Sequence, residues 1–289
     1  MAKKKSGSIA VPFLLTIFFG LLIIGGGTYW LYNYLGLNGK KALKEPQPRA
    51  AAVVTEEDSH TVLLILDEPE QQCSSTFVLM SSKPKEKKVV FMGIPTNTIA
   101  IMDGQQEHIK NLYDRGGAQS AVKFVRDGLR LQVDRYIKFD SASFRKVCDI
   151  LGGVTYQVNS NIAGFKKDGG DEYLNSRQIE TLVTYPGFSG REIERAYTAS
   201  SILSAMVNQT DGKRVADNFK TSFDSVINMV TTDITSVDYK NRQFAIRSML
   251  EYGTTIASFV IMEGEPFNDD FIPSETFLAD AQRLYFEVK

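Results

Sequence analysis

The chain has 289 residues, of which 43% are hydrophobic and 23% charged, and its formal net charge is −1. This length suits one or two domains, and the composition excludes a collagen-like, a low-complexity and a disulfide-dense protein. The charges are unevenly distributed, because the 34 positions from 6 to 39 contain none.

The uncharged stretch predicts a membrane anchor. Residues 9–35 are almost wholly apolar or aromatic, and a bilayer core requires about 20 such residues. The lysines of residues 1–8 predict a cytoplasmic tail, and the tyrosines and tryptophan at the far end suit the membrane–water interface. The alternatives are a cleaved signal peptide, which has a shorter apolar core and a small-residue cleavage site, and a buried helix. We therefore expect a single-pass protein of the cell membrane with an extracellular C-terminal part.

The charge balance gives no support for nucleic-acid binding. Without the three N-terminal lysines, 30 basic residues remain against 34 acidic ones. Proteins that bind nucleic acid neutralise phosphates with a basic surplus, which this chain lacks. We expect no nucleic-acid partner, which weighs against a role in transcriptional regulation.

The predicted extracellular part begins with a stalk at residues 36–59, where charges, prolines and small residues mix. Residues 60–289 alternate between short apolar runs and helical spacing, which predicts an α/β domain with helices on a central sheet. The expected strands, in chain order, are Val62–Leu66, Phe77–Met80, Val89–Met92, Tyr136–Phe139, Val154–Val158 and Phe259–Met262. The expected helices are 118–129, 144–151, Ser176–Thr184, Glu192–Val207, Val215–Val230 and Val237–Met249, with a loop at 159–173.

Few residues point to chemistry by themselves. The sequence contains no P-loop, no dinucleotide-binding glycine fingerprint, no Gly-x-Ser-x-Gly and no Cys-x-x-Cys. An acidic cluster, Asp67–Glu70, follows the first strand, where α/β proteins place ligand-binding loops, so it is either a metal or proton site or a solvated loop. Arg191 and Arg195 are four residues apart near a helix start, which predicts one face that either binds a phosphate or carries arginines paired with Glu192 or Glu194.

The cysteines leave two states open. Cys73 and Cys148 form a disulfide or remain two buried free thiols, because bridging requires Cα atoms within about 7 Å. Only two histidines are present, which excludes a His-rich zinc site.

The order of several motifs resembles the LytR-CpsA-Psr (LCP) family over roughly residues 60–209. Asp134–Val154 resembles the family's Asp-x-Tyr strand and its helix ending in Gly-Gly-Val. Further similar segments are Phe77–Pro95 (a hairpin before Ile-Pro), Asn111–Gly117 (Tyr-x-x-Gly-Gly), Leu174–Gln178 (Leu-Asp-Gly-Glu-Gln) and Gly190–Arg195 (Gly-Arg-x-x-Arg).

The resemblance implies a fold and a function. LCP proteins are membrane-anchored bacterial proteins that transfer glycopolymers from a polyprenyl pyrophosphate lipid onto peptidoglycan. The resemblance therefore implies a central mixed β-sheet flanked by helices and a role in the cell envelope. The partners that it implies are the membrane, a polyprenyl-linked glycopolymer and peptidoglycan. The resemblance also implies that Asp67, Arg191 and Arg195 are catalytic and that Asp67 positions Mg²⁺.

This chain departs from the family at its charged motifs. Thr96 follows Ile-Pro where the family has arginine, Cys73 stands in the family's Arg-x-Asp-Thr motif, and Thr184 lies near another expected arginine. Threonine and cysteine lack the charge and fork of arginine, and each lost contact to a transition-state charge typically costs about 10²–10³ in rate. Two hypotheses follow: a transferase in which other cations bind the substrate, or a catalytically inactive lipid-binding or scaffold protein that docks wall-synthesis partners. The cations that would compensate as substrate-binding residues are Lys110, Arg115 and Arg177.

Overall fold

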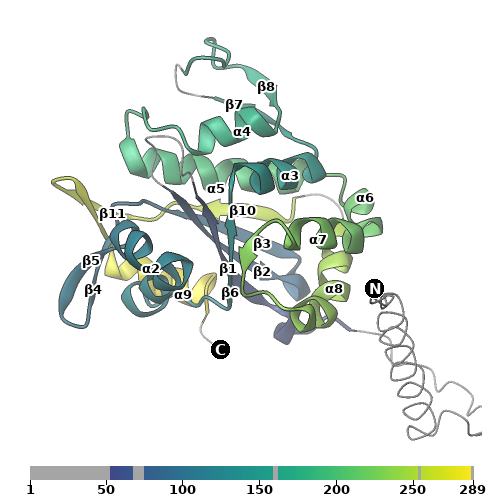
Figure 1. The fold of residues 1–289 in the computed structure, drawn as a ribbon, viewed down its shortest axis with the longest axis horizontal. Helices are drawn as coiled ribbons and strands as arrows, with labels where there is room; N and C mark the ends of the chain where they lie inside the picture. The colour runs from purple at the N-terminus through teal and green to yellow at the C-terminus, as the bar shows by residue number, and fades with distance from the viewer. Residues whose placement is uncertain (1–52, 68–74, 159–161, 253–254, 288–289) are drawn as a thin grey trace, which may run out of the picture. The chain divides into compact units, whose positions relative to one another are not determined.

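The computed structural model describes residues 53–67, 75–158, 162–252 and 255–287 (Figure 1). The predicted tail, anchor and most of the stalk, together with Cys73 and Glu68–Glu70, lie outside these residues. Within the described ranges no helix has the length and apolarity needed to cross a bilayer. Residues from Val53 onward form one compact unit.

A six-stranded mixed sheet forms the centre of this unit, in the order β10-β3-β2-β1-β6-β9. Strands β1, β2 and β3 are antiparallel neighbours, whereas β6 pairs parallel with β1 and β10 parallel with β3. The bounds are β1 His60–Leu66, β2 Thr76–Lys83, β3 Lys88–Ile94, β6 Arg135–Phe139, β9 Thr231–Thr232 and β10 Ala257–Val260. The mixed sheet flanked by helices confirms the predicted fold class.

Two apolar clusters, one on each face of the sheet, explain its near-continuous hydrophobic strands. The first cluster packs Leu63, Ile65, Phe77 and Leu79 against α2 and α9. The second packs Leu66 and the other strand residues whose side chains point to the opposite face against α3, α4, α5 and α8. In Figure 1 the group α3–α5 covers one side of the sheet and α2 with α9 lies on the other. The bounds are α2 Ile109–Lys123, α3 Ser141–Leu151, α4 Ser176–Val183, α5 Arg191–Gln209, α8 Ser236–Glu251 and α9 Glu275–Leu284.

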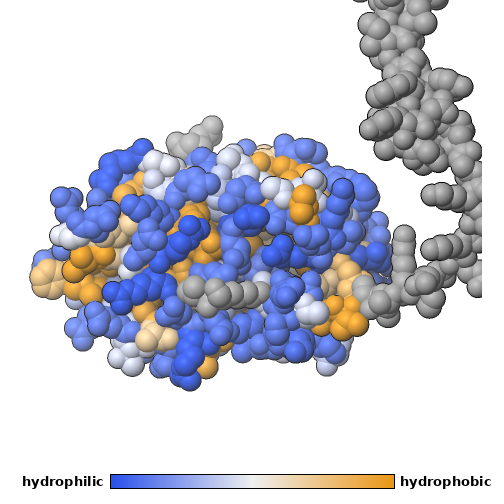
Figure 2. All heavy atoms as spheres, turned by 90° about the horizontal axis from the view of Figure 1, so that it is seen from below, coloured by the Kyte–Doolittle hydropathy of each residue, from blue (hydrophilic) through white to orange (hydrophobic). Residues whose placement is uncertain are grey.

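Short elements complete the unit. Two 3-10 helices are η1 Glu56–Asp58 and η2 Pro84–Glu86, and a π-helix, η3 Phe124–Gly128, follows α2. Three hairpins are β4 Ile99–Met102 with β5 Gln105–His108, β7 Val154–Gln157 with β8 Asp171–Leu174, and β11 Gly264–Phe267 with β12 Asp270–Pro273. Two further helices are α6 Gly212–Asp217 and α7 Phe219–Ile227. Hydrophilic side chains cover most of the face seen in Figure 2, where apolar side chains form small separate groups.

Three predictions about elements are wrong. The loop at 159–173 gives way to β8 at Asp171, because the polar residues of β8 pair only with β7 at the surface. The helix over 215–230 is two helices, α6 and α7, that meet at Asn218, whose backbone is not helical. The strand near 259 is not the last element, since β11, β12 and α9 follow it.

Helix α3 follows its sequence signals closely. Asp140 caps it by accepting a hydrogen bond from the Ser143 amide at 2.8 Å, and Gly152 ends it with a left-handed φ of 106°. In this conformation the Gly152 amide donates to the Cys148 carbonyl, and the chain then continues into β7. The helix therefore stands directly after β6, beside the end of the sheet that holds the candidate site.

Candidate functional site

Some of the polar residues predicted from the sequence lie together at one edge of the central sheet, where several strands end. Leu66 at the end of β1 pairs with Thr76 at the start of β2 and with Phe139 at the end of β6. Phe77 pairs with Ile94, so the end of β3 lies at the same edge. Asp67 and Thr96 follow β1 and β3 there, which agrees with the tendency of α/β sheets to bind ligands at carboxyl ends of strands.

Asp67 forms an ion pair with a lysine that the sequence analysis did not name. Lys138 of β6 places Nζ 2.8 Å from Asp67 Oδ2, and the hydroxyl of Ser75 donates to Oδ1 at 3.3 Å. The side chains of Asp67 and Lys138 are 27% and 33% exposed, so solvent reaches both. The hydrogen bond to Asp67 raises the pKa of Lys138 above its ordinary value, which keeps the amine charged at neutral pH.

Tyr113 of α2 lies beside this pair. It is 6% exposed, and the Lys138 amine lies 5.8 Å from the centre of its ring. Burial raises the pKa of the Tyr113 hydroxyl, and the negative charge of Asp67 raises it further. The hydroxyl lies close enough to Asp67 and Lys138 for hydrogen bonding with both to influence its pKa, although neither contact has the geometry of a full hydrogen bond.

Arg195 of α5 lies at the neighbouring strand end. Its side chain is 3% exposed, and its Nη2 donates to Thr96 Oγ1 at 3.2 Å and to the carboxylate of Glu192. Thr96 also donates to Glu192. The positive charge of Arg195 is therefore already matched by a carboxylate, as a buried charge requires.

A glycine brings Arg195 to this position. A Cβ on Gly93 of β3 would overlap the backbone carbonyl of Ala196, so only glycine allows α5 to pack this closely on the strand. The residue next to Ala196 on the helix is Arg195, which consequently reaches the end of β3.

The prediction that Arg191 and Arg195 share one helix face is wrong. Arg191 has a left-handed φ of 52°, so regular helical spacing begins only after it. Its side chain is 75% exposed and pairs with Asp269 at 3.0 Å. The predicted pairing with Glu192 does occur, but it is made by Arg195 and it is buried rather than exposed.

An apolar cavity of about 70 Å³ begins at the same edge, between the sheet and α3, α4 and α5. Leu66, Thr76 and Phe139 line it, and each adjoins one of the polar residues Asp67, Ser75 and Lys138 in the chain. Because successive strand residues point to opposite faces, the polar side chains face α2 while their neighbours face the cavity. The other lining residues are all apolar: Leu64, Val78, Phe144, Val147, Val183, Ala199 and Leu203.

The cations predicted to compensate for missing arginines do not gather at this edge. Lys110 pairs with Asp114, one turn along α2, and Arg115 pairs with Glu107 at 2.7 Å. Arg177 is exposed in the first turn of α4. Thr184 is buried at the end of that helix, where its hydroxyl donates to the Glu180 carbonyl at 2.8 Å.

The described residues around Asp67 do not suit the Mg²⁺ that the family resemblance implies. One carboxylate oxygen already bonds an ammonium and the other a hydroxyl. In the described part of the chain no three Asp, Glu, His or Cys residues are grouped so that they could hold a metal ion. At phosphate sites Mg²⁺ is usually held by one or two carboxylates together with waters and substrate phosphates, and here both oxygens of Asp67 are already bonded to protein groups.

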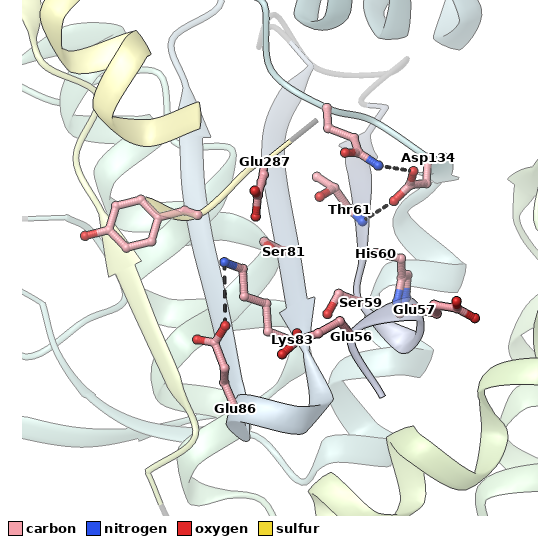
Figure 3. A pocket seen from close by; sticks show the side chains of 12 residues that line it. Glu56, Glu57, Ser59, His60, Thr61, Ser81, Lys83, Glu86, Asp134 and Glu287 are labelled. Atoms are coloured by element: carbon pink, nitrogen blue, oxygen red, sulfur yellow. Dashed lines mark hydrogen bonds and ion pairs between the residues drawn. The ribbon is translucent and has the colours of Figure 1, made fainter. Parts of the chain in front are cut away.

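A larger cavity, of about 350 Å³, lies at the opposite edge of the sheet (Figure 3). His60 and Thr61 begin β1 there, and Lys83 ends β2. Lys83 is 3.8 Å from Glu86 and donates to the Leu284 carbonyl at 3.1 Å. The lining carboxylates outnumber the cations: Glu56, Glu57, Glu86, Asp134 and Glu287. This acidic surplus repels phosphates, so the larger cavity is the poorer candidate for a phosphate-bearing ligand.

Comparison with known proteins decides the family. The model of the LytR_cpsA_psr family matches residues 36–261, which is most of the chain. The chain belongs to this family. Among curated relatives, the polyisoprenyl-teichoic acid–peptidoglycan teichoic acid transferase TagU of Bacillus subtilis is 30% identical over 174 residues, which are 56% of this chain and 55% of that protein. TagU of Bacillus licheniformis is 29% identical over 172 residues, 55% of each chain. The chain thus aligns with about half the length of these relatives.

Several solved structures have the same fold as this chain. A protein of Eubacterium siraeum described as a transcription regulator has a TM-score of 0.70 at 21% identity, covering 82% of this chain and 95% of its own. TagV of Bacillus subtilis has a TM-score of 0.62 at 18% identity, covering 79% and 96%. TagT bound to LI-WTA has a TM-score of 0.61 at 19% identity, covering 81% and 92%. At these identities the likeness shows the fold alone.

Lys138 and Tyr113 were missed for different reasons. Lys138 is the one charged residue in the otherwise apolar strand segment Tyr-Ile-Lys-Phe, which by itself does not indicate a site. Only the parallel register of β6 with β1 brings Lys138 to Asp67. Tyr113 lies in the Tyr-x-x-Gly-Gly motif, which supported the family resemblance but falls before the predicted helix at 118–129, so nothing indicated which strand end it would face. Cys148 is a buried free thiol whose burial raises its pKa to about 12, so it is not a nucleophile of this site.

Proposed function

We propose that this chain handles polyprenyl-(pyro)phosphate-linked glycopolymers in bacterial cell-envelope assembly and presents them for transfer to peptidoglycan. The observation that carries the proposal is the meeting of the Asp67–Lys138 pair with the end of an apolar cavity at one sheet edge. Such a ligand has a phosphate head and an apolar tail, and the two parts of this edge match them. The printed names of the relatives, which are transferases of teichoic acid from a polyisoprenyl carrier to peptidoglycan, support the same class of substrate.

The cavity would have to widen to admit a polyprenyl chain. Its volume of about 70 Å³ is smaller than the roughly 150 Å³ cavity that admits benzene in an engineered protein. The side chains of α3 and α5 that line it are apolar, which suits contact with a polyprenyl chain. The tail would then replace contacts that the helices make with each other.

In the transferase form of this proposal, an acceptor hydroxyl attacks the phosphorus that carries the glycan. The new P–O bond forms as the bond to the polyprenyl phosphate breaks, and the hydroxyl proton passes to Asp67. Lys138 would balance the charge on the phosphate oxygens. Arg195 would contribute only if the ligand displaced Glu192 from it.

The second candidate is a catalytically inactive lipid-binding or scaffold protein that docks wall-synthesis partners. This candidate is favoured because the cations at the sheet edge are neutralised by ion pairs, Lys138 with Asp67 and Arg195 with Glu192. Pyrophosphate carries several negative charges, and a transferase must stabilise them as the bond breaks. A neutral edge would still bind the lipid through its tail.

The proposal includes the membrane arrangement expected from the sequence. Residues 9–35 would anchor the chain with residues 1–8 in the cytoplasm, and the stalk 36–59 would hold the domain 60–289 outside the cell. The candidate site would then lie near the outer leaflet, where a lipid-linked substrate is delivered. A protease-protection assay tests this arrangement, and digestion of residues 60–289 from the cytoplasmic side would contradict it.

A turnover assay separates the two candidates. The full-length chain, purified in detergent, is incubated with a polyprenyl pyrophosphate-linked glycopolymer and peptidoglycan. The transferase form predicts glycan on the peptidoglycan and a tenfold or larger loss of rate in Asp67→Asn, with Asp103→Asn as an exposed control. Binding of the lipid without transfer supports the second candidate, and absence of both binding and transfer contradicts the proposed function as a whole.

A further inference from the structure

The ion pair at the sheet edge bears on the metal requirement of this chain. Asp67 is the residue to which the family resemblance assigns Mg²⁺, yet its Oδ2 already lies 2.8 Å from the Lys138 amine. Resting on the proposed function, we propose that the Lys138 ammonium takes the place of a divalent cation at Asp67, so that the chain binds the phosphate head of its lipid without metal.

The position of Lys138 is fixed by the sheet. It belongs to β6, which pairs in parallel with β1, and its Cα is opposite Ile65, two residues before Asp67. The backbone amide of Asp67 also donates to the Phe139 carbonyl at 2.8 Å. Both partners are therefore held by strand hydrogen bonds, and only the side chain of Lys138 must be ordered to form the pair.

The charges at the site agree with this arrangement. A carboxylate that binds Mg²⁺ leaves a net positive charge for the phosphate, whereas the Asp67–Lys138 pair is neutral. An ammonium has three N–H donors and Asp67 uses one, so the remaining donors are available to phosphate oxygens. Phosphate binding here would depend on hydrogen bonds more than on net charge.

The Tyr113 hydroxyl lies beside the pair, so one ligand oxygen would contact both Tyr113 and Lys138. The hydroxyl is buried and close enough to Asp67 and Lys138 for both to influence its pKa, but neither contact has the geometry of a full hydrogen bond. A phosphate oxygen on the Lys138 amine would give the hydroxyl an acceptor. Within the described ranges, no group of three or more Asp, Glu, His or Cys residues could hold a metal ion.

A Mg²⁺ titration without lipid tests the proposal directly. The melting temperature of the full-length chain is measured in EDTA and in excess Mg²⁺, for the wild type, Lys138→Met and the matched control Lys110→Met, whose lysine also pairs with an aspartate. We expect Mg²⁺ to leave the wild type and the control unchanged and to stabilise Lys138→Met, in which Asp67 has lost its partner. A stabilisation of the wild type that disappears in Asp67→Asn would overturn the proposal.

A binding experiment with geranyl pyrophosphate completes the test. We expect the wild type to bind equally well in EDTA and in Mg²⁺, and Lys138→Met and Tyr113→Phe to bind about tenfold more weakly in EDTA, the effect of losing one hydrogen bond to a charged group. Binding by the wild type only in Mg²⁺ would overturn the inference and leave the proposed function standing. If geranyl pyrophosphate does not bind in either condition, the proposed function fails, and the titration without lipid still decides the role of Lys138.

Discussion

Lys138 belongs to β6 and Asp67 directly follows β1, and their side chains lie 2.8 Å apart at the edge of the central sheet. The parallel pairing of β6 with β1 creates this contact, and the same pairing places Leu66 and Phe139 at the end of the apolar cavity. A single feature of topology therefore joins the polar and the apolar halves of the candidate site.

Replacing Arg195 with alanine should destabilise the protein strongly. The change leaves the partly buried Glu192 without its cation, and breaking a buried ion pair costs about 3–5 kcal/mol. Arg191→Ala, which removes an exposed pair with Asp269, should change the free energy of unfolding by less than about 1 kcal/mol. Urea unfolding of both variants checks this, and equal effects would show that Arg195 is not buried as described.

Replacing Gly93 with alanine should separate β3 from α5. The added methyl group overlaps the Ala196 carbonyl, and overpacking of this kind typically costs about 1–3 kcal/mol. The matched control is Gly170→Ala, where the nearest atoms belong to the movable side chain of Asp168. A thermal melt of Gly93→Ala that matches the wild type would contradict the close packing that positions Arg195.

Filling the apolar cavity should weaken lipid binding. Leu203→Phe adds volume to a cavity of about 70 Å³, whereas Val207→Phe introduces the same phenyl ring one turn later on α5 and outside the cavity. We expect the first variant to bind geranyl pyrophosphate at least about tenfold more weakly and the second to bind as the wild type does. Each variant's melting temperature is measured alongside, and equal binding by the two would remove the cavity from the account.

The free energy of unfolding should decrease at acid pH as Asp238 of α8 becomes protonated. Arg135 donates to both of its carboxylate oxygens at 3.0 Å, and this hydrogen bonding holds the pKa of Asp238 well below its ordinary value of 3.8. A lowered pKa in the folded state means that the stabilisation is complete above about pH 4 and is lost as the pH falls further.

Asp238→Asn measures this contribution. We expect a loss of about 2 kcal/mol at neutral pH, the size expected for hydrogen bonds between charged groups, and a difference from the wild type that shrinks as the pH falls below about 4. The exposed pair of Asp217 with Lys213 provides the control, Asp217→Asn, which should have little effect at any pH. A difference that stays constant down to pH 3 would contradict the assignment.

The sequence predicted most of the fold because its signals are local. The run Val62–Leu66 identified a strand by hydrophobicity, and Gly152-Gly153 identified the end of α3 by its left-handed backbone. One missed strand, β11, is four residues long and fully exposed, so it has no hydrophobic period that would predict it. Asn218 interrupts α6 and α7 through backbone geometry that composition does not encode.

The candidate site was less predictable because its contacts are long-range. Asp67 was identified by its place after a strand, but its partner Lys138 depends on strand register and its neighbour Tyr113 on how α2 docks. Arg191 and Arg195 were grouped by helical spacing, and one positive φ at Arg191 separates them. The motif order nevertheless identified the family, since it depends on the sequence of segments and not on how they pack.

Photo-crosslinking tests the central claim that the lipid-linked substrate binds at the edge holding Asp67 and Lys138. A polyprenyl pyrophosphate with a diazirine on the isoprene nearest the head group is activated on the full-length chain, and the modified residues are identified by mass spectrometry. The account predicts adducts on residues that line the apolar cavity, such as Leu66, Phe139 and Phe144, and their loss in Leu203→Phe. Adducts at the acidic cavity around Thr61 and Lys83, or labelling that Leu203→Phe leaves unchanged, would contradict it.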